Sequence, residues 1–124
     1  MIIDSHCHLE YEPMSLNLDK TITRANKDGV KYLLTISTTD KSLKKILKIT
    51  SDFNCVYGTY GIHPHEAKNH KNIKCEEIIN KIKLSKKIIG IGETGLDFYY
   101  NHSEKKDQMY SFEEHINAAQ LSNI

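Results

Sequence analysis

Four short apolar runs alternate with polar segments in which apolar residues recur at helical spacing. The apolar runs cover residues 1–6, 30–37, 55–62 and 88–92. Their length and β-branched content favour strands. Helices are predicted over 18–28, from 39 or 40 to 49, over 75–84 and over 103–121. The sequence therefore predicts four β-α units in succession.

The predicted helices have recognisable boundaries and apolar faces. Gly29 follows the first helix and favours its end there, and Thr39 or Asp40 can cap the second. The last helix carries one apolar face, formed by Met109, Phe112, Ile116 and Ala119.

Strands that alternate with helices predict a parallel sheet with right-handed crossovers, and so an α/β fold. Nearly continuous apolar strands such as YLLTI and IIGIG are typical of a sheet covered on both faces. No repeat or linker divides the chain, so residues 1–124 are expected to form a single domain. Because parallel strands all point the same way, their carboxyl ends meet at one edge, where α/β proteins place their ligand sites.

Composition narrows the function classes only slightly. With 17 basic and 16 acidic residues the net charge is +1, so any nucleic acid would have to be bound at a local site. The three cysteines form no CxxC pair, which fits a reducing cytoplasm. No signal peptide is visible, and no run approaches the roughly 18 apolar residues of a membrane span. A cytoplasmic protein without a membrane partner is expected.

The first predicted strand ends in two histidines separated by one cysteine. In an extended segment, side chains two residues apart point the same way, so His6 and His8 share a direction while Cys7 faces the helices. Two imidazoles so placed can bind one divalent cation. The alternative is one hydrogen-bonded histidine and one surface histidine, because so short a motif is not specific.

An acidic residue, Glu93, follows the fourth apolar run directly. A carboxylate at the mouth of a buried strand must be paired, hydrated or bound to a cation, because burying it alone is costly. It could bridge two cations, whereas the alternative is a helix cap or an ion pair with a lysine. Asp97 is expected to shape the loop or support a ligand rather than to bind metal.

His63 and His65 flank Pro64, whose fixed φ stiffens the turn after the third strand. Imidazoles here could hold a substrate phosphate or a leaving group. The alternative for His65 is an ordinary loop histidine. The other histidines, His70, His102 and His115, are assigned no role.

Three ordered motifs resemble one known family. DSHCHL at 4–9, GIHPHEA at 61–67 and IGETGLDFYY at 91–100 are similar to the TatD family of metal-dependent hydrolases, deoxyribonucleases of the amidohydrolase type. The segment 17–38 and the tail from Gln108 resemble the same family, so the similarity covers essentially the whole chain. The resemblance implies a TIM (β/α)8 barrel, of which four β-α units form the N-terminal half.

The resemblance also implies roles for individual residues. His6 and His8 match the family's first metal pair, Glu93 its bridging ligand, and His63 a position that contacts substrate phosphate; His65 is grouped with it. The implied reaction is hydrolysis of a phosphodiester in DNA with two divalent cations, which could be Mg, Mn or Zn.

The chain departs from the family pattern in length. A (β/α)8 barrel needs about 250 residues, so the chain is expected to be a truncated half that lacks the later ligands and is inactive alone. Two alternatives remain open: a second copy or a separate second half completes the barrel, or the chain is the remnant of an interrupted gene. A phosphoesterase of the PHP type also begins with HxH, but GIHPH and GETGLD argue against it.

Overall fold

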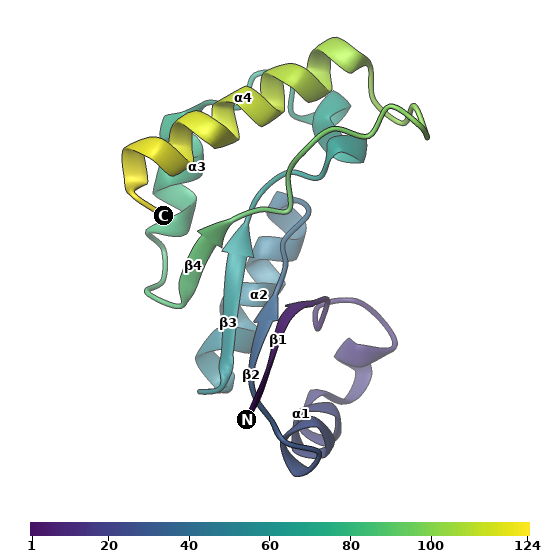
Figure 1. Cartoon of the computed structure of the whole chain (residues 1–124), viewed down its shortest axis with the longest axis vertical. Helices are drawn as coiled ribbons and strands as arrows, with labels where there is room; N and C mark the ends of the chain where they lie inside the picture. The colour runs from purple at the N-terminus through teal and green to yellow at the C-terminus, as the bar shows by residue number, and fades with distance from the viewer.

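Four parallel strands form one sheet in the order β1-β2-β3-β4 in the computed structural model, which describes residues 1–124 (Figure 1). The strands are β1 (Ile2–Cys7), β2 (Val30–Thr35), β3 (Val56–Tyr60) and β4 (Ile88–Ile91). Each neighbouring pair is parallel. The predicted order of strands and helices is confirmed, and all four carboxyl ends lie on one side of the sheet.

Helices follow every strand. They are α1 (Leu18–Lys27), α2 (Asp40–Asp52), α3 (Cys75–Ile82) and α4 (Lys105–Ser122), with the 3-10 helices η1 (Met14–Asn17) and η2 (Pro64–Asn69) in the loops after β1 and β3. The predicted cap of α2 is Thr39, whose hydroxyl accepts the main-chain N–H of Ser42 in a capping box. Gly29 ends the α1 segment with φ +96°, a conformation that glycine adopts without strain.

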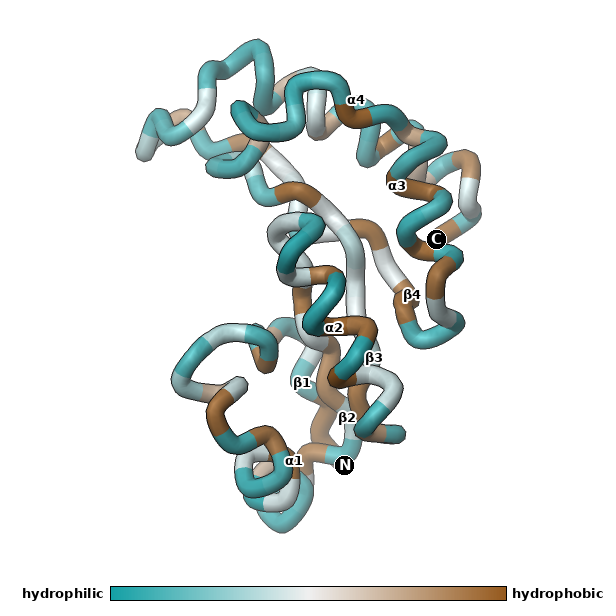
Figure 2. Tube along the Cα trace, turned by 180° about the vertical axis from the view of Figure 1, so that it is seen from behind, coloured by the Kyte–Doolittle hydropathy of each residue, from teal (hydrophilic) through white to brown (hydrophobic).

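The core lies between the sheet and the helices on one of its faces. Figure 2 shows α2 in front of β2 and β3, whereas Figure 1 shows it behind them. Ile46 of α2 and Tyr60 of β3 are fully buried in the larger apolar cluster, and Leu33 and Val56 belong to a second cluster near α1. None of the helices is both long and apolar enough to span a membrane.

The chain covers only this one face of the sheet. On the other, inner face an open hollow of about 290 Å³ is lined almost entirely by apolar side chains, among them Ile3, Tyr32, Leu34, Tyr57 and Ile89. Ile3, Tyr32 and Ile89 are exposed. The sequence pattern indicated a sheet covered on both faces, and the apolar side chains of the inner face are present without a cover from this chain.

Helix α4 packs through its polar side. The side chains of α4 that are buried belong to Asp107, Gln108, Ser111, His115 and Ala118. Of the apolar face expected from the sequence, Met109 and Ile116 are exposed and Phe112 and Ala119 are half-buried. Two of these polar side chains, Gln108 and His115, hydrogen-bond main-chain atoms, and Asp107 pairs with Lys71 at 3.0 Å. The Nε2 atom of His115, for example, accepts the N–H of Ile62 at 3.0 Å.

The inner face and the free edges of β1 and β4 predict self-association. We expect a second copy to cover the inner face, since a two-fold axis would place β4 of one copy beside β1 of the other and close eight parallel strands. Ile89→Lys, on the inner face, should lower the association measured by sedimentation velocity. Leu16→Lys changes another exposed apolar residue, which lies outside that face, and is the control. A strictly monomeric wild type at high concentration would contradict this expectation.

Burial of His115 predicts a loss of stability in acid. Burial lowers the pKa of His115 below its ordinary 6.5, and its Nδ1–H donates to the main-chain oxygen of Ser111. The unfolded chain then binds more protons than the folded chain as the pH falls below 6.5, so the free energy of unfolding decreases there. Urea titrations at pH 7.5 and 5.5 should show a smaller decrease for His115→Gln than for the wild type. An equal decrease in both would contradict the assignment.

Candidate metal centre

The side chains singled out from the sequence lie at the carboxyl ends of the strands. His6 belongs to the end of β1, and His8 follows it by two residues. Glu93 follows β4, and His63 lies between β3 and η2. Residues from three different β-α units therefore meet at one edge of the sheet.

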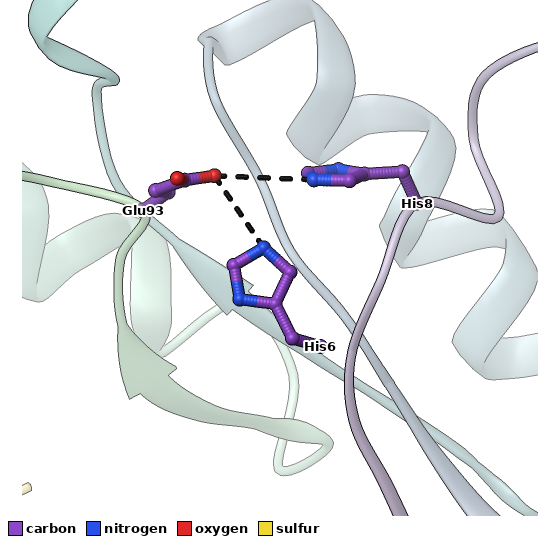
Figure 3. A group of neighbouring side chains, drawn as sticks. All are labelled: His6, His8 and Glu93. Carbon is purple, nitrogen blue, oxygen red and sulfur yellow. Dashed lines mark ion pairs between the residues drawn. The ribbon is translucent and has the colours of Figure 1, made fainter.

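His6, His8 and Glu93 form a compact cluster. The Oε2 atom of Glu93 lies 3.6 Å from Nε2 of His6 and 3.9 Å from Nε2 of His8 (Figure 3). One potential ligand atom from each residue lies within 4.8 Å of the others. Two atoms bound to one ion at about 2.1 Å would lie about 3.0–3.4 Å apart, so small side-chain movements suffice to bring all three onto one cation.

The ring of His8 is oriented by groups on its far side. Its Nδ1 atom lies 3.1 Å from the main-chain oxygen of Ile36 and 3.2 Å from Oε1 of Glu10. Because a carbonyl oxygen only accepts, the proton of the neutral ring is on Nδ1, and Nε2 is left with a lone pair. Such an outer carboxylate or carbonyl is the usual partner of a metal-binding histidine.

Glu10 contacts the ring of His8 and was not singled out from the sequence. It is fully buried, with an exposed fraction of 0%, and its Oε2 atom accepts the hydroxyl of Thr35 at 2.7 Å. A buried carboxylate is stable only with such partners. A signal was present, because Glu10 continues the two-residue period of His6 and His8, although nothing local indicated that it would be buried.

The main chain at Glu93 is fixed by its neighbours. The N–H of Glu93 donates to the main-chain oxygen of Ser37 at 2.7 Å, and the N–H of Gly92 to that of Tyr60 at 2.8 Å. Gly61 lies close to this segment: a Cβ atom at position 61 would be 2.6 Å from main-chain carbons of Gly92 and 2.9 Å from the main-chain oxygen of Glu93. Because residue 61 has no side chain, the main chain of Gly92 and Glu93 can approach it closely, and this contact positions the carboxylate of Glu93.

His63 presents a hydrogen-bond donor beside this cluster. Its Nδ1 atom accepts the main-chain N–H of His65 at 3.2 Å, so the neutral ring carries its proton on Nε2. Nε2 lies 3.7 Å from Oε1 of Glu93. Burial lowers the pKa of His63, against the opposing influence of Glu93, and so favours the neutral ring. A protonated Nε2 is suited to an anionic oxygen rather than to a cation.

His65 and Asp97 form a separate pair next to the cluster. Nε2 of His65 lies 2.6 Å from Oδ2 of Asp97, and this hydrogen bond is the main cause that lowers the pKa of Asp97. The other oxygen of Asp97 accepts the main-chain N–H groups of Tyr99 and Tyr100. Asp97 therefore contacts its own loop and His65, not the three clustered side chains.

Gln108 holds the same loop and was also missed by the sequence reasoning. Its Oε1 atom accepts the N–H of Asp97 at 2.8 Å, and its Nε2 donates to the oxygens of Asp97 and Ser103. Ser103 in turn donates to the main-chain oxygen of His65. The sequence around Gln108 gives no sign of this role, because the burial of its side chain is seen only in the structure.

The donor set of the cluster fits a divalent cation. Two imidazole nitrogens and one carboxylate suit Zn or Mn, and also Mg if water completes the shell. Cys7 adds no soft ligand, because its Sγ donates to the main-chain oxygen of Leu34, as the alternation along the strand predicts. Burial raises the pKa of the Cys7 thiol to about 12.

Comparisons with known proteins all point to one family. Residues 3–124 match the family described as TatD related DNase. An uncharacterized metal-dependent hydrolase of Buchnera aphidicola subsp. Acyrthosiphon pisum is 37% identical over 95% of this chain and 48% of its own. The uncharacterized metal-dependent hydrolase YcfH of Escherichia coli is 29% identical over 93% of this chain and 43% of its own.

Solved structures show the same fold. The crystal structure of YjjV, a TatD homologue from Escherichia coli, superposes with a TM-score of 0.89 at 22% identity, over 99% of this chain and 48% of that one. A TatD family hydrolase from Entamoeba histolytica gives a TM-score of 0.82 over 46% of its chain. The chain spans about half the length of the relatives it matches.

Gly61→Ala should weaken metal binding without unfolding the protein. The new methyl group would push the main chain of Gly92 and Glu93 away, so we expect affinity for Mn to fall about 10- to 100-fold, as when a supporting residue is lost. Isothermal titration calorimetry measures it. Gly90→Ala is the control, because its Cβ would meet only a methyl group of Thr59, at 3.2 Å. Equal affinities of Gly61→Ala and wild type would contradict the positioning role.

Proposed function

Because the chain belongs to the family of TatD-related DNases, we propose that its strand-end cluster is part of a metal site for hydrolysis of DNA phosphodiesters. The observation that carries the proposal is the convergence of His6, His8 and Glu93 from two distant strands. The relatives' names as metal-dependent hydrolases support the cation. The three free cysteines fit a cytoplasmic location.

Different residues of the chain would bind the cation and the phosphate at this site. A bound divalent cation would polarise the phosphoryl oxygen and lower the pKa of water. His6, His8 and Glu93 would hold it, with the ring of His8 fixed from behind by Ile36 and Glu10. The protonated Nε2 of His63 is placed to donate a hydrogen bond to a phosphate oxygen.

His65 and Asp97 would support this substrate side of the site. The main-chain N–H of His65 fixes the ring of His63, and Asp97 in turn fixes the ring of His65. The proton on His63 Nε2 therefore depends on the main-chain N–H of His65, and the side chain of that residue is held by the loop after β4. We propose that both histidines face the phosphodiester, with Asp97 in a supporting role.

Three donors are too few for the two-cation chemistry that the family resemblance implies. We propose that the chain alone binds a cation weakly and reversibly and does not hydrolyse DNA, because no further carboxylate of the chain joins the cluster to orient a water. A second copy on the inner face would only repeat the same three donors, so hydrolysis would need different ligands from a complementary second half.

Calorimetry tests the cation site directly. We expect saturable binding that weakens in the order Zn, Mn, Mg, as nitrogen ligands favour the first two. His8→Ala should abolish it, and His70→Ala, a histidine outside the cluster, should not. Identical binding by the His8→Ala variant would contradict the site.

A fusion protein tests the reaction. The chain alone should leave end-labelled DNA intact in Mn. Fusing it to the part of the Buchnera relative beyond the matched region should produce cleavage. The cleavage should disappear in the His6→Ala, His8→Ala double variant and persist in His70→Ala. A folded, metal-binding fusion that leaves DNA intact would contradict DNA hydrolysis.

A further inference from the structure

A row of aromatic rings leads away from the metal cluster. His63, which lies 3.7 Å from Glu93, has its ring centroid 4.4 Å from that of His65. The ring of His65 is 4.4 Å from that of His102 and 5.8 Å from that of Tyr100. Tyr99 follows at 4.9 Å from Tyr100. The row therefore connects the candidate cation site with the loop after β4.

The two outer rings of this row, those of Tyr99 and Tyr100, are not packed in the core. Tyr99 has an exposed fraction of 85% and Tyr100 of 63%. Aromatic side chains stabilise a fold mainly by burial, which these two do not achieve. Adjacent exposed aromatic rings are instead typical of a surface that contacts a ligand or partner.

The loop that carries these rings is held in place. The carboxylate of Asp97 accepts the main-chain N–H groups of both tyrosines, and Gln108 of α4 fixes the main chain of Asp97 from the other side. His65, in the middle of the row, is bound to the same carboxylate. The rings are thus presented on fixed main chain rather than on a free loop, which lowers the entropy lost on binding.

Flat aromatic rings beside a phosphate site match the chemistry of a nucleotide. A cation and the donor of His63 can bind a phosphate, but neither contacts a base. Unpaired bases stack on tyrosine and histidine rings, whatever their sequence. The net charge of the chain is only +1, so stacking can supply binding free energy that an excess of positive charge does not.

We propose that Tyr99 and Tyr100, with His65 and His102, form a base-binding subsite in which an unpaired nucleobase stacks beside the phosphate held at the cluster. The subsite rests on the proposed phosphodiester function and adds to it the recognition of a base. Duplex DNA, whose bases are stacked inside the helix, does not fill it.

An abasic oligonucleotide separates base from phosphate. We compare a fluorescein-labelled ten-nucleotide dT strand with an abasic strand of the same length, by anisotropy in Mn, and check on a gel that both stay intact. The dT strand should bind at least about fivefold more tightly. Tyr100→Ala should weaken dT binding about 5- to 30-fold and leave abasic binding unchanged.

Two further variants make the result specific. Tyr100→Phe keeps the ring without the hydroxyl and should retain dT binding, whereas Tyr32→Ala removes an exposed ring on the inner face of the sheet and should change nothing. Circular dichroism verifies that each variant is folded.

Three results would overturn the subsite: equal affinity of the wild type for both strands, an equal loss on both strands in Tyr100→Ala, or no binding of dT. DNA cleavage by the fusion protein together with any of them would overturn the subsite alone. Absence of cleavage with intact base discrimination would overturn the hydrolase proposal instead.

Discussion

The contact between Gly61 and the main chain of Gly92 and Glu93 is the constraint on which the candidate site depends. Parallel pairing of β3 with β4 brings the two strand ends together, but only a residue without a side chain lets them approach as closely as they do. Hydrogen bonds from Gly92 and Glu93 to Tyr60 and Ser37 then fix the direction in which the carboxylate leaves the sheet. The position of the acid is therefore a property of the sheet rather than of a flexible loop.

The support around the cluster comes from segments far apart in sequence. Glu10 reaches Thr35 across 25 residues, and the ring of His8 reaches Ile36 across 28. On the other side, Gln108 ties α4 to the loop of Asp97. Each tie satisfies a buried polar group and at the same time orients a side chain at the strand ends. Stability and site geometry thus rest on the same hydrogen bonds.

The sequence predicted the elements and the clustered residues well, for a physical reason. Apolar periodicity is local, and the rule that parallel strands share one carboxyl edge converts it into the placement of His6, His8 and Glu93. It did not predict Glu10 or Gln108, because their partners are chosen by tertiary packing. Nor did it predict which side of α4 is buried, since a polar face can be buried when main-chain groups of neighbouring segments need partners.

The alternation along β1 has a chemical consequence for metal choice. Cys7 lies between two imidazoles, yet its sulfur points to the helix side and donates to the main-chain oxygen of Leu34. Copper(I) and cadmium, which prefer thiolate, therefore find only nitrogen and oxygen at this strand end. A shift of β1 by one residue would turn the sulfur of Cys7 toward the site and favour soft cations. In the observed register the site favours borderline and hard cations.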